Sequence, residues 1–174
     1  MSPRRQRLTT LVVMGVAGSG KTTVMAALAD RLGWPTLEGD SLHPPKNVAK
    51  MAAGIPLDDA DRAPWLAEIA RWIGDREAAR ASSLVTCSAL RRPYRDLIRA
   101  GHPSAWFVHL VAPVEVLASR MAEREGHFMP ASLLASQLAA LEPLEREEPG
   151  SSVNAVEDPA AIADQIITEL RLTA

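Results

Sequence analysis

Residues 15–22 read Gly-Val-Ala-Gly-Ser-Gly-Lys-Thr, a complete GxxxxGK[ST] phosphate-binding loop. An apolar run from Leu11 to Met14 precedes the loop, and a helix-like run from Lys21 to Leu32 follows it. This strand–loop–helix setting gives the pattern its meaning, because the glycines let backbone N–H groups face a phosphate at the positive end of a helix. The alternative, a glycine-rich turn that matches by accident, fits this context poorly. The stretch therefore predicts a protein that binds a nucleoside triphosphate.

The chemistry of the loop residues predicts their roles. Lys21 can reach the β- and γ-phosphates, and the Thr22 hydroxyl can ligate Mg²⁺. We therefore expect ATP and Mg²⁺ as cofactors, with Thr22 as the metal ligand and Lys21 as a catalytic residue. The residues expected to contact ATP are Gly15, Val16, Ala17, Gly18, Ser19, Gly20, Lys21, Thr22, Thr23 and, from a later helix, Arg120.

Length and composition restrict the class of protein. The chain has 174 residues, which suit a single domain over 1–174, and 47% of them are apolar, which argues against disorder. The formal net charge of −2 gives no sign of a nucleic-acid partner. A lone cysteine, Cys87, excludes an internal disulfide and suggests no cysteine-based metal site. With no apolar run of membrane-spanning length, we expect no membrane partner and a cytoplasmic location.

Short apolar runs alternate with helix-like stretches along the chain. The expected strands are Thr10–Met14, Thr36–Glu38, Leu84–Cys87, Ala105–Leu110 and Ser152–Val156. The expected helices are Lys21–Leu32, Val48–Ala53, Pro64–Ala81, Pro93–Ala100, Val114–Arg124, Ala131–Leu141 and Ala160–Leu172. Such alternation indicates an α/β fold, a five-stranded parallel sheet flanked by helices, as in P-loop kinases.

Two stretches interrupt this alternation. One, rich in Pro, Asp and Asn, covers about 40–66, and the other, with many charges and prolines, covers about 124–148. Ligands of open α/β sheets bind beyond the carboxyl ends of the strands, where both stretches begin or follow one helix later. We expect the first to bind a second substrate and the second, as a weakly packed segment, to form a lid.

The position of the acidic residues distinguishes between classes of phosphate-loop protein. A GTPase would carry NKxD and DxxG motifs, which are missing. A motor or AAA-type ATPase would usually end a strand in Asp or Asp-Glu, whereas the third strand here runs into Cys87-Ser88. A carboxylate instead follows the second strand, in Glu38-Gly39-Asp40, where small-molecule kinases often meet the acceptor hydroxyl. Asp40 is therefore the candidate that orients this hydroxyl and accepts its proton, with a turn or helix-capping Asp as the alternative.

Basic residues gather after the expected strand ends: Arg91, Arg92 and Arg95, then Arg120 and Arg124, and also His43 and Lys46. Any one such group is usually a solvated helix face. Together they suit an anionic acceptor and a charged transition state, because guanidinium groups pair with carboxylate and phosphate through two hydrogen bonds. Arg124 is expected to move towards the phosphates when the lid closes.

Several blocks of the sequence resemble the gluconokinases, and the resemblance runs from about residue 11 to 158. These blocks are Gly39-Asp40-Ser41-Leu42-His43-Pro44-Pro45-Lys46-Asn47, Asp61-Arg62-Ala63-Pro64-Trp65-Leu66, Cys87-Ser88-Ala89-Leu90-Arg91-Arg92, Tyr94-Arg95-Asp96, Gly126-His127-Phe128-Met129-Pro130 and Ser136-Gln137. The resemblance implies a nucleoside-monophosphate-kinase-like fold and usually a homodimer. It also implies ATP-dependent phosphorylation of D-gluconate at its 6-hydroxyl, which gives 6-phosphogluconate for the pentose phosphate or Entner–Doudoroff routes.

The resemblance and the residue chemistry together give a set of expected substrate ligands. Asp40 fits the reacting hydroxyl, and the arginines fit the carboxylate of gluconate. The full expected set is Asp40, His43, Lys46, Arg62, Arg91, Tyr94, Arg95 and His127, and the catalytic set is Lys21, Asp40 and Arg124. Which arginine binds which group stays open at this point.

Two other functions are compatible with the loop. One is another small-acceptor kinase, such as a shikimate-kinase-like or nucleoside-monophosphate-kinase-like enzyme, which would also use Asp40 but does not explain the GDxLHPxxN and DRxPWL blocks. The other, a nucleotide-gated binding protein, would need switch motifs that are missing.

Overall fold

The computed structural model describes residues 7–124 and 132–174. Five strands form one sheet in the order β2-β3-β1-β4-β5, and every neighbouring pair is parallel. The strands are β1 (Thr10–Met14), β2 (Thr36–Glu38), β3 (Ser83–Thr86), β4 (Ala105–Val111) and β5 (Gly150–Asn154). The prediction of a five-stranded parallel sheet flanked by helices is confirmed.

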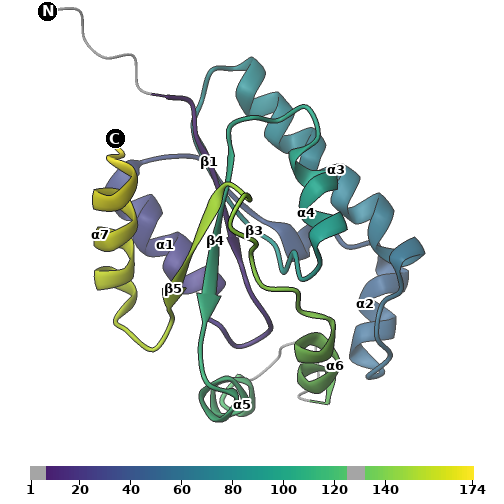
Figure 1. Ribbon diagram of the computed structural model, residues 1–174. Coiled ribbons are helices and arrows are strands. Elements are labelled where there is room, and N and C mark those ends of the chain that lie inside the picture. The colour runs from purple at the N-terminus through teal and green to yellow at the C-terminus, as the bar shows by residue number, and fades with distance from the viewer. Residues whose placement is uncertain (1–6, 125–131) are drawn as a thin grey trace, which may run out of the picture.

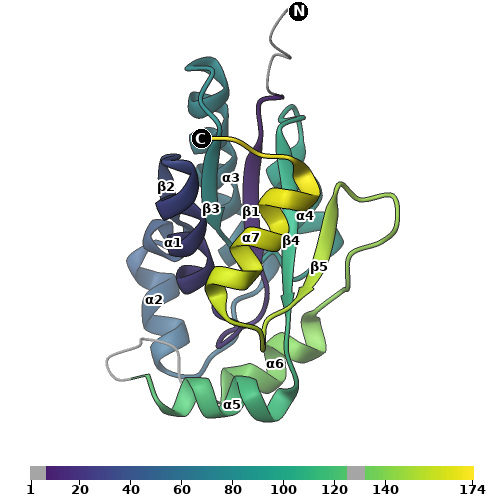
Figure 2. The same cartoon turned by 90° about the vertical axis from the view of Figure 1, so that its left-hand side faces the viewer.

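Helices cover both faces of this sheet. In Figure 1, α1 (Lys21–Leu32) and α7 (Pro159–Leu170) lie on one side, and α3 (Asp59–Ala78) and α4 (Arg92–Arg99) lie on the other. The short helices α5 (Val114–Ala122) and α6 (Leu133–Ala140) lie at one end of the sheet, and α2 (Pro45–Ala52) lies beside that end (Figures 1 and 2). Within the described part of the chain, no helix is both long and apolar enough to cross a membrane.

The central strand β1 is buried at every position and is apolar from Leu11 to Met14. Leu11 and Val13 pack with α1 and α7, whereas Val12 and Met14 pack with α3 and α4. Successive side chains of a strand point to opposite faces, so a strand covered on both sides is apolar at most of its positions. Burial of both faces fixes the phosphate loop, which directly follows β1, against a rigid support.

Helix α3 begins earlier than the sequence pattern predicts. The expected helix began at Pro64, but α3 starts at Asp59, and Pro64 lies within it. The start is fixed by a capping box in which the Asp58 side chain accepts from the Asp61 N–H and the Asp61 side chain accepts from the Asp58 N–H. These hydrogen bonds satisfy free N–H groups of the first turn, which outweighs the preference of proline for the first position.

Candidate active site

The phosphate loop joins β1 to α1 in a conformation that requires glycine. Gly15, Gly18 and Gly20 have φ values of 148°, 80° and 93°. A Cβ atom on Gly18 would lie 2.7 Å from the Leu117 carbonyl oxygen, and one on Gly15 would lie 2.7 Å from Ser19 Oγ. Contacts this short are not tolerated, so backbone conformation and packing both exclude larger residues here. The conformation of the loop therefore depends on glycine at these positions.

The loop has the chemistry of an anion cradle. Lys21 Nζ donates to the carbonyl oxygens of Gly15 and Val16, at 3.1 and 3.2 Å, so the ammonium lies over the loop. Desolvation lowers the pKa of Lys21, and the nearby Asp40 carboxylate acts in the opposite direction. The buried Ser19 hydroxyl has no hydrogen-bond partner among the described residues. A triphosphate would supply the missing acceptor and the counter-charge, so these residues fit ATP.

A cavity of about 490 Å³ opens beside the loop. Lys21, Asp40, Arg62 and Arg124 line it, although they come from separate segments. Its walls also include residues of the loop and of α6, namely Ala17, Gly18, Gly20, Thr22, Thr23, Leu133, Ser136 and Gln137. The structure therefore brings together two of the elements that the sequence predicted to act together, the phosphate loop and Asp40, and adds α6 as a third wall.

Strand β2 and the turn after it position Asp40. Thr86 Oγ1 donates to Glu38 Oε2 at 2.6 Å and accepts from the Gly39 N–H at 3.2 Å. A Cβ atom on Gly39 would lie 2.0 Å from the Thr86 carbonyl oxygen, so only glycine allows this close approach of the two strand ends. Trp65 Nε1 donates to the Gly39 carbonyl at 2.7 Å. Asp40 is therefore held at the carboxyl edge of the sheet, with its side chain 36% exposed towards the cavity.

A protein of Gluconobacter oxydans (strain 621H) that is named gluconokinase is similar to this chain. The two are 51% identical over 157 residues, which cover 90% of this chain and 88% of the relative. The chain belongs to the gluconokinase family. A family profile described as an AAA domain also matches residues 11–144. The carboxylate that an AAA-type ATPase would usually carry after its strand is absent from the end of β3, where Thr86 is followed by Cys87 and Ser88.

Solved structures agree with membership of the gluconokinase family. A sugar kinase from Janibacter sp. HTCC2649, solved without ligand, has a TM-score of 0.89 at 49% identity, and covers 94% of this chain and 95% of its own. A gluconokinase from Sinorhizobium meliloti 1021 has a TM-score of 0.82 at 46% identity, with 96% and 94% covered. Shikimate kinase from Acinetobacter baumannii shares the fold alone, with a TM-score of 0.63 at 21% identity over 95% and 94% of the two chains.

The GDxLHPxxN block of this gluconokinase-family chain folds into one wall of the cavity. His43 stacks on Trp65, with ring centroids 4.0 Å apart and planes inclined by 21°. His43 Nε2 lies 3.9 Å from Asp40 Oδ1, and its Nδ1 lies 3.3 Å from Asn47 Nδ2. Lys46 is exposed and does not line the cavity, so the structure does not bring this predicted ligand to the site.

Arg62, from the DRxPWL block, also lines the cavity. Its Nη1 donates to the Leu57 carbonyl and to Tyr94 Oη, the latter at 3.3 Å, and its guanidinium lies 5.3 Å from the centroid of the Tyr94 ring. Tyr94 Oη in turn donates to Asp59 Oδ1 at 2.5 Å. Tyr94 therefore contacts Arg62 but does not itself line the cavity.

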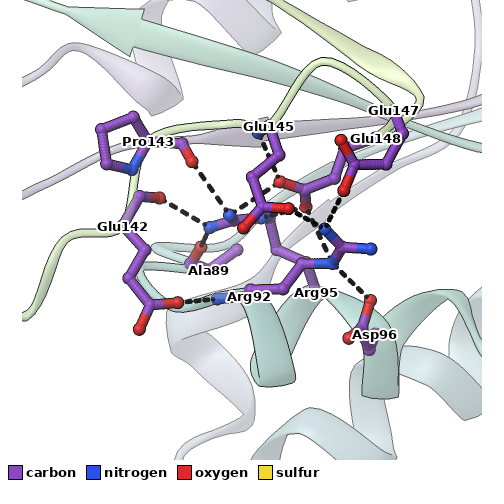
Figure 3. A network of polar contacts seen from close by, with 9 residues as sticks. All are labelled: Ala89, Arg92, Arg95, Asp96, Glu142, Pro143, Glu145, Glu147 and Glu148. Carbon is purple, nitrogen blue, oxygen red and sulfur yellow. Dashed lines mark hydrogen bonds and ion pairs between the residues drawn. The ribbon is translucent and has the colours of Figure 1, made fainter.

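Arg95 does not reach the cavity, which corrects its predicted role as a substrate ligand. Its side chain is 1% exposed and pairs with Glu148, itself 3% exposed, through Nε–Oε1 and Nη2–Oε2 contacts of 2.6 and 2.9 Å. Its other N–H groups donate to the carbonyl oxygens of Ala89, Glu142 and Pro143 (Figure 3). All five donors of the guanidinium are thus used inside the protein, and none is left for a ligand.

Arg91 is also placed outside the cavity. It lies between Asp59 and Glu142, with ion-pair distances of 3.8 and 3.4 Å, and packs 5.9 Å from the Tyr94 ring centroid. His127 lies outside the described residues, so its predicted role stays a prediction. Of the arginines predicted to bind the substrate, the structure therefore brings Arg62 to the cavity and keeps Arg91 and Arg95 away.

The parts of the predicted lid, 124–148, differ in how they pack. Residues 125–131 lie outside the described part of the chain. The last part, 142–148, is fixed to α4: Glu148 is buried against Arg95, and Arg92 pairs with Glu145 and Glu147 at 2.7 and 3.2 Å (Figure 3). The acidic side chains that suggested weak packing are thus paired with arginines of α4, about 50 positions earlier in the sequence. The weak packing from which the lid was predicted is therefore not found at 142–148, and α6 is the part of the segment that borders the cavity. The lid itself stays a prediction.

Two arginines flank the loop on the nucleotide side. Arg120 Nη2 donates to the Ala155 carbonyl at 2.8 Å, while Nη1 lies 3.5 and 3.4 Å from the carbonyl oxygens of Gly18 and Ser19. A second hollow of about 290 Å³ lies between the loop, Arg120 and the segment at Ala155. Arg124 borders both spaces.

The sequence reasoning missed Gln137, which joins α6 to the phosphate loop. Its Oε1 accepts from the Ala17 N–H at 2.7 Å, across 120 positions of sequence. Around this bond, Val16 and Ala17 pack with Leu134 of α6 and Leu117 of α5 in one apolar cluster. The Ser136-Gln137 pair stood among the family-like blocks, but nothing in its local pattern indicates a partner so distant.

Proposed function

We propose that this protein transfers the γ-phosphoryl group of ATP to the 6-hydroxyl of D-gluconate and releases ADP and 6-phospho-D-gluconate. The observation that carries the proposal is that the phosphate loop, Asp40 and Arg62 border one cavity of about 490 Å³. A phosphate donor site, a carboxylate and a cationic anchor thus share one space. An acceptor with a hydroxyl at one end and a carboxylate at the other fits this arrangement, and the names of the family relatives agree with it.

On the donor side, the loop would hold the phosphates of ATP and Lys21 would stabilise the charge that develops during transfer. The hollow beside Arg120 is suited to the nucleoside. Mg²⁺ is expected to accompany ATP, with Thr22 Oγ1 as its protein ligand. Within residues 7–124 and 132–174, no group of three His, Cys, Asp or Glu side chains could hold a metal ion. An ion bound mainly through phosphates and water, as Mg²⁺ usually is, needs no such group.

On the acceptor side, Arg62 is the proposed anchor for the carboxylate. Within the described residues, both of its hydrogen bonds come from Nη1, which leaves Nε and Nη2 available to a bound anion. Asp40 would orient the reacting hydroxyl and accept its proton as the bond to phosphorus forms. Arg124, at the boundary of the two spaces, would approach the transferred phosphoryl group.

The quaternary state and location belong to the same proposal. A homodimer is implied by the family resemblance, and light scattering on a sizing column would detect it as twice the chain mass of 18.7 kDa. A cytoplasmic location would supply the ATP that the reaction consumes.

Release of ADP, measured with a panel of acceptors, tests the reaction. We expect turnover with D-gluconate and little with shikimate or with no acceptor. The variant Arg62→Met should raise the KM for gluconate by about 10- to 100-fold, the loss of a charge-assisted pair, with a smaller change in the KM for ATP. Arg62→Lys, which keeps the charge, serves as the matched control and should fall between the two.

Two results would contradict the proposal. Faster turnover with shikimate than with gluconate would favour a shikimate-kinase-like enzyme. ATP hydrolysis that ignores every acceptor would favour a nucleotide-gated binding protein.

A further inference from the structure

Asn47 is a polar side chain buried at the base of the acceptor site. Its exposed fraction is 0%, although it lies on α2, one turn after His43. Its Nδ2 donates to the Asp61 carbonyl oxygen at 2.9 Å and lies 3.3 Å from His43 Nδ1. Asn47 thus touches both family-like blocks, GDxLHPxxN and DRxPWL, from inside the protein.

The contact with Asp61 fixes the orientation of the Asn47 amide. A backbone carbonyl oxygen can only accept, so the amide nitrogen, not the oxygen, must face it. The same nitrogen faces His43 Nδ1. An amide N–H₂ group can only donate, so Nδ1 must accept and cannot carry a proton. The ring proton of His43 is therefore on Nε2.

Nε2 is the nitrogen that faces the reaction site. It lies 3.9 Å from Asp40 Oδ1, and the His43 side chain is only 3% exposed. This distance is too long for a direct hydrogen bond. An oxygen atom beside the two could reach both at ordinary hydrogen-bond lengths. The stack on Trp65 keeps the ring in this orientation.

We propose that Asn47 is a positioning residue that holds His43 as the Nε2–H tautomer, so that His43 and Asp40 together orient the acceptor hydroxyl. This inference rests on the proposed function. His43 Nε2–H donates to one lone pair of the hydroxyl oxygen, and the hydroxyl proton is directed to Asp40. The second lone pair then faces the phosphorus. When the oxygen–phosphorus bond forms, this proton passes to Asp40 and the γ-phosphoryl group leaves ADP.

The surroundings of His43 favour the neutral ring that this arrangement needs. Desolvation is the main influence that lowers the pKa of His43. The charged groups that face the ring are Asp40, which raises the pKa, and Arg62 on α3, which lowers it. The Asn47 donor acts in the same direction as Arg62, since a proton on Nδ1 would meet another N–H group.

The tautomer can be measured directly by long-range ¹H–¹⁵N NMR of the histidine rings, without substrate. The signals of His43 are assigned by their loss in the variant His43→Gln. We expect the proton on Nε2 in the wild-type protein and a mixture of tautomers in Asn47→Leu. A proton on Nδ1 in the wild type would overturn the proposal.

A double-mutant cycle then connects the tautomer to catalysis. Asn47→Leu should lower kcat with gluconate by about 10- to 100-fold and change the KM for ATP by less than about threefold. Gln at position 43 carries an amide N–H near the place of Nε2–H and has no tautomers. In the His43→Gln background, Asn47→Leu should therefore cost less than about threefold. Equal costs in both backgrounds would show that Asn47 acts on folding alone, and would overturn the proposal.

A third variant keeps the proposal testable if Asn47→Leu does not fold. His43→Leu removes the donor and leaves Asn47 intact, and it should lower kcat at least about tenfold more than His43→Gln. Equal loss in the two variants would contradict a role for the Nε2 proton. Wild-type turnover with gluconate, measured in the same assay, reports on the proposed function alone, whereas the ring signals recorded without substrate report on Asn47 alone.

Discussion

Replacement of Arg95 by Met should lower the stability of the protein strongly, and its main effect should not be on substrate binding. The side chain of Arg95 is 1% exposed and makes five hydrogen bonds, two of them to Glu148, which is 3% exposed. The variant leaves the buried Glu148 carboxylate with only the more distant Arg92, 3.8 Å away, as counter-charge, and removes the Arg95 donors from three carbonyl oxygens. Loss of one partner of a buried pair costs about 3–5 kcal/mol in the free energy of unfolding.

Urea unfolding followed by circular dichroism measures this loss. With a denaturant slope of about 2 kcal/mol/M, the midpoint should fall by about 1.5–2.5 M. Arg91→Met is the matched control, because its pairs with Asp59 and Glu142 are partly exposed and such pairs contribute about 0–1 kcal/mol. The double variant Arg95→Met with Glu148→Leu should recover much of the loss, because no unpaired charge remains.

The pH dependence gives an independent check. Burial alone would raise the pKa of Glu148, but hydrogen bonds from Arg95 and from the Glu145 N–H keep it below the ordinary value. A group whose pKa is lower in the folded state stabilises the protein above its unfolded pKa of about 4.3, and this contribution is lost as the pH falls through the folded pKa. The stability gap between wild type and Arg95→Met should therefore narrow below about pH 4. A folded Arg95→Met protein with an unchanged urea midpoint and a raised KM for gluconate would refute this reasoning and restore Arg95 as a ligand.

Three further variants test the site. Lys21→Ala should lower turnover by about 10²-fold or more with the fold intact, because its charge stabilises the β- and γ-phosphates; near-normal turnover in a stopped assay would refute the assignment. Asp40→Asn should lower kcat about 10²- to 10⁴-fold and change ATP affinity, measured by calorimetry, less than about tenfold. Weaker binding of ATP only when Mg²⁺ is present would point instead to a metal-linked carboxylate. Gln137→Met keeps the length but not the acceptor for the Ala17 N–H. Its kcat/KM for ATP should fall about 5- to 100-fold, and an unchanged value would show that the bond between α6 and the loop is dispensable.

Local sequence determined the elements that depend on local physics. The conformation of the loop at residues 15–22 could be predicted because it depends on glycines within the loop and on the helix that directly follows. The apolar runs predicted the strands to within two residues, since a strand covered on both faces has few polar positions. Buried polar residues that it keeps can bond each other, as the hydroxyl groups of Thr10 and Ser83 do. Where two local signals competed, at Asp58 and Pro64, only the structure showed that the capping box sets the start of α3.

Tertiary structure decided which charged residues serve the site. Arg62, Arg91 and Arg95 look alike in the sequence, and each suited a carboxylate ligand. The fold brings Glu148 to Arg95 and Glu142 to Arg91, and each of these pairs joins residues about 50 positions apart in the sequence. Arg62, in contrast, lies at the cavity. The same holds for Gln137, whose partner Ala17 is 120 positions away. The role of a charged or amide side chain depends on its neighbour in space. Neighbours so distant in the sequence are brought together by the packing of helices on the sheet, which no local pattern encodes.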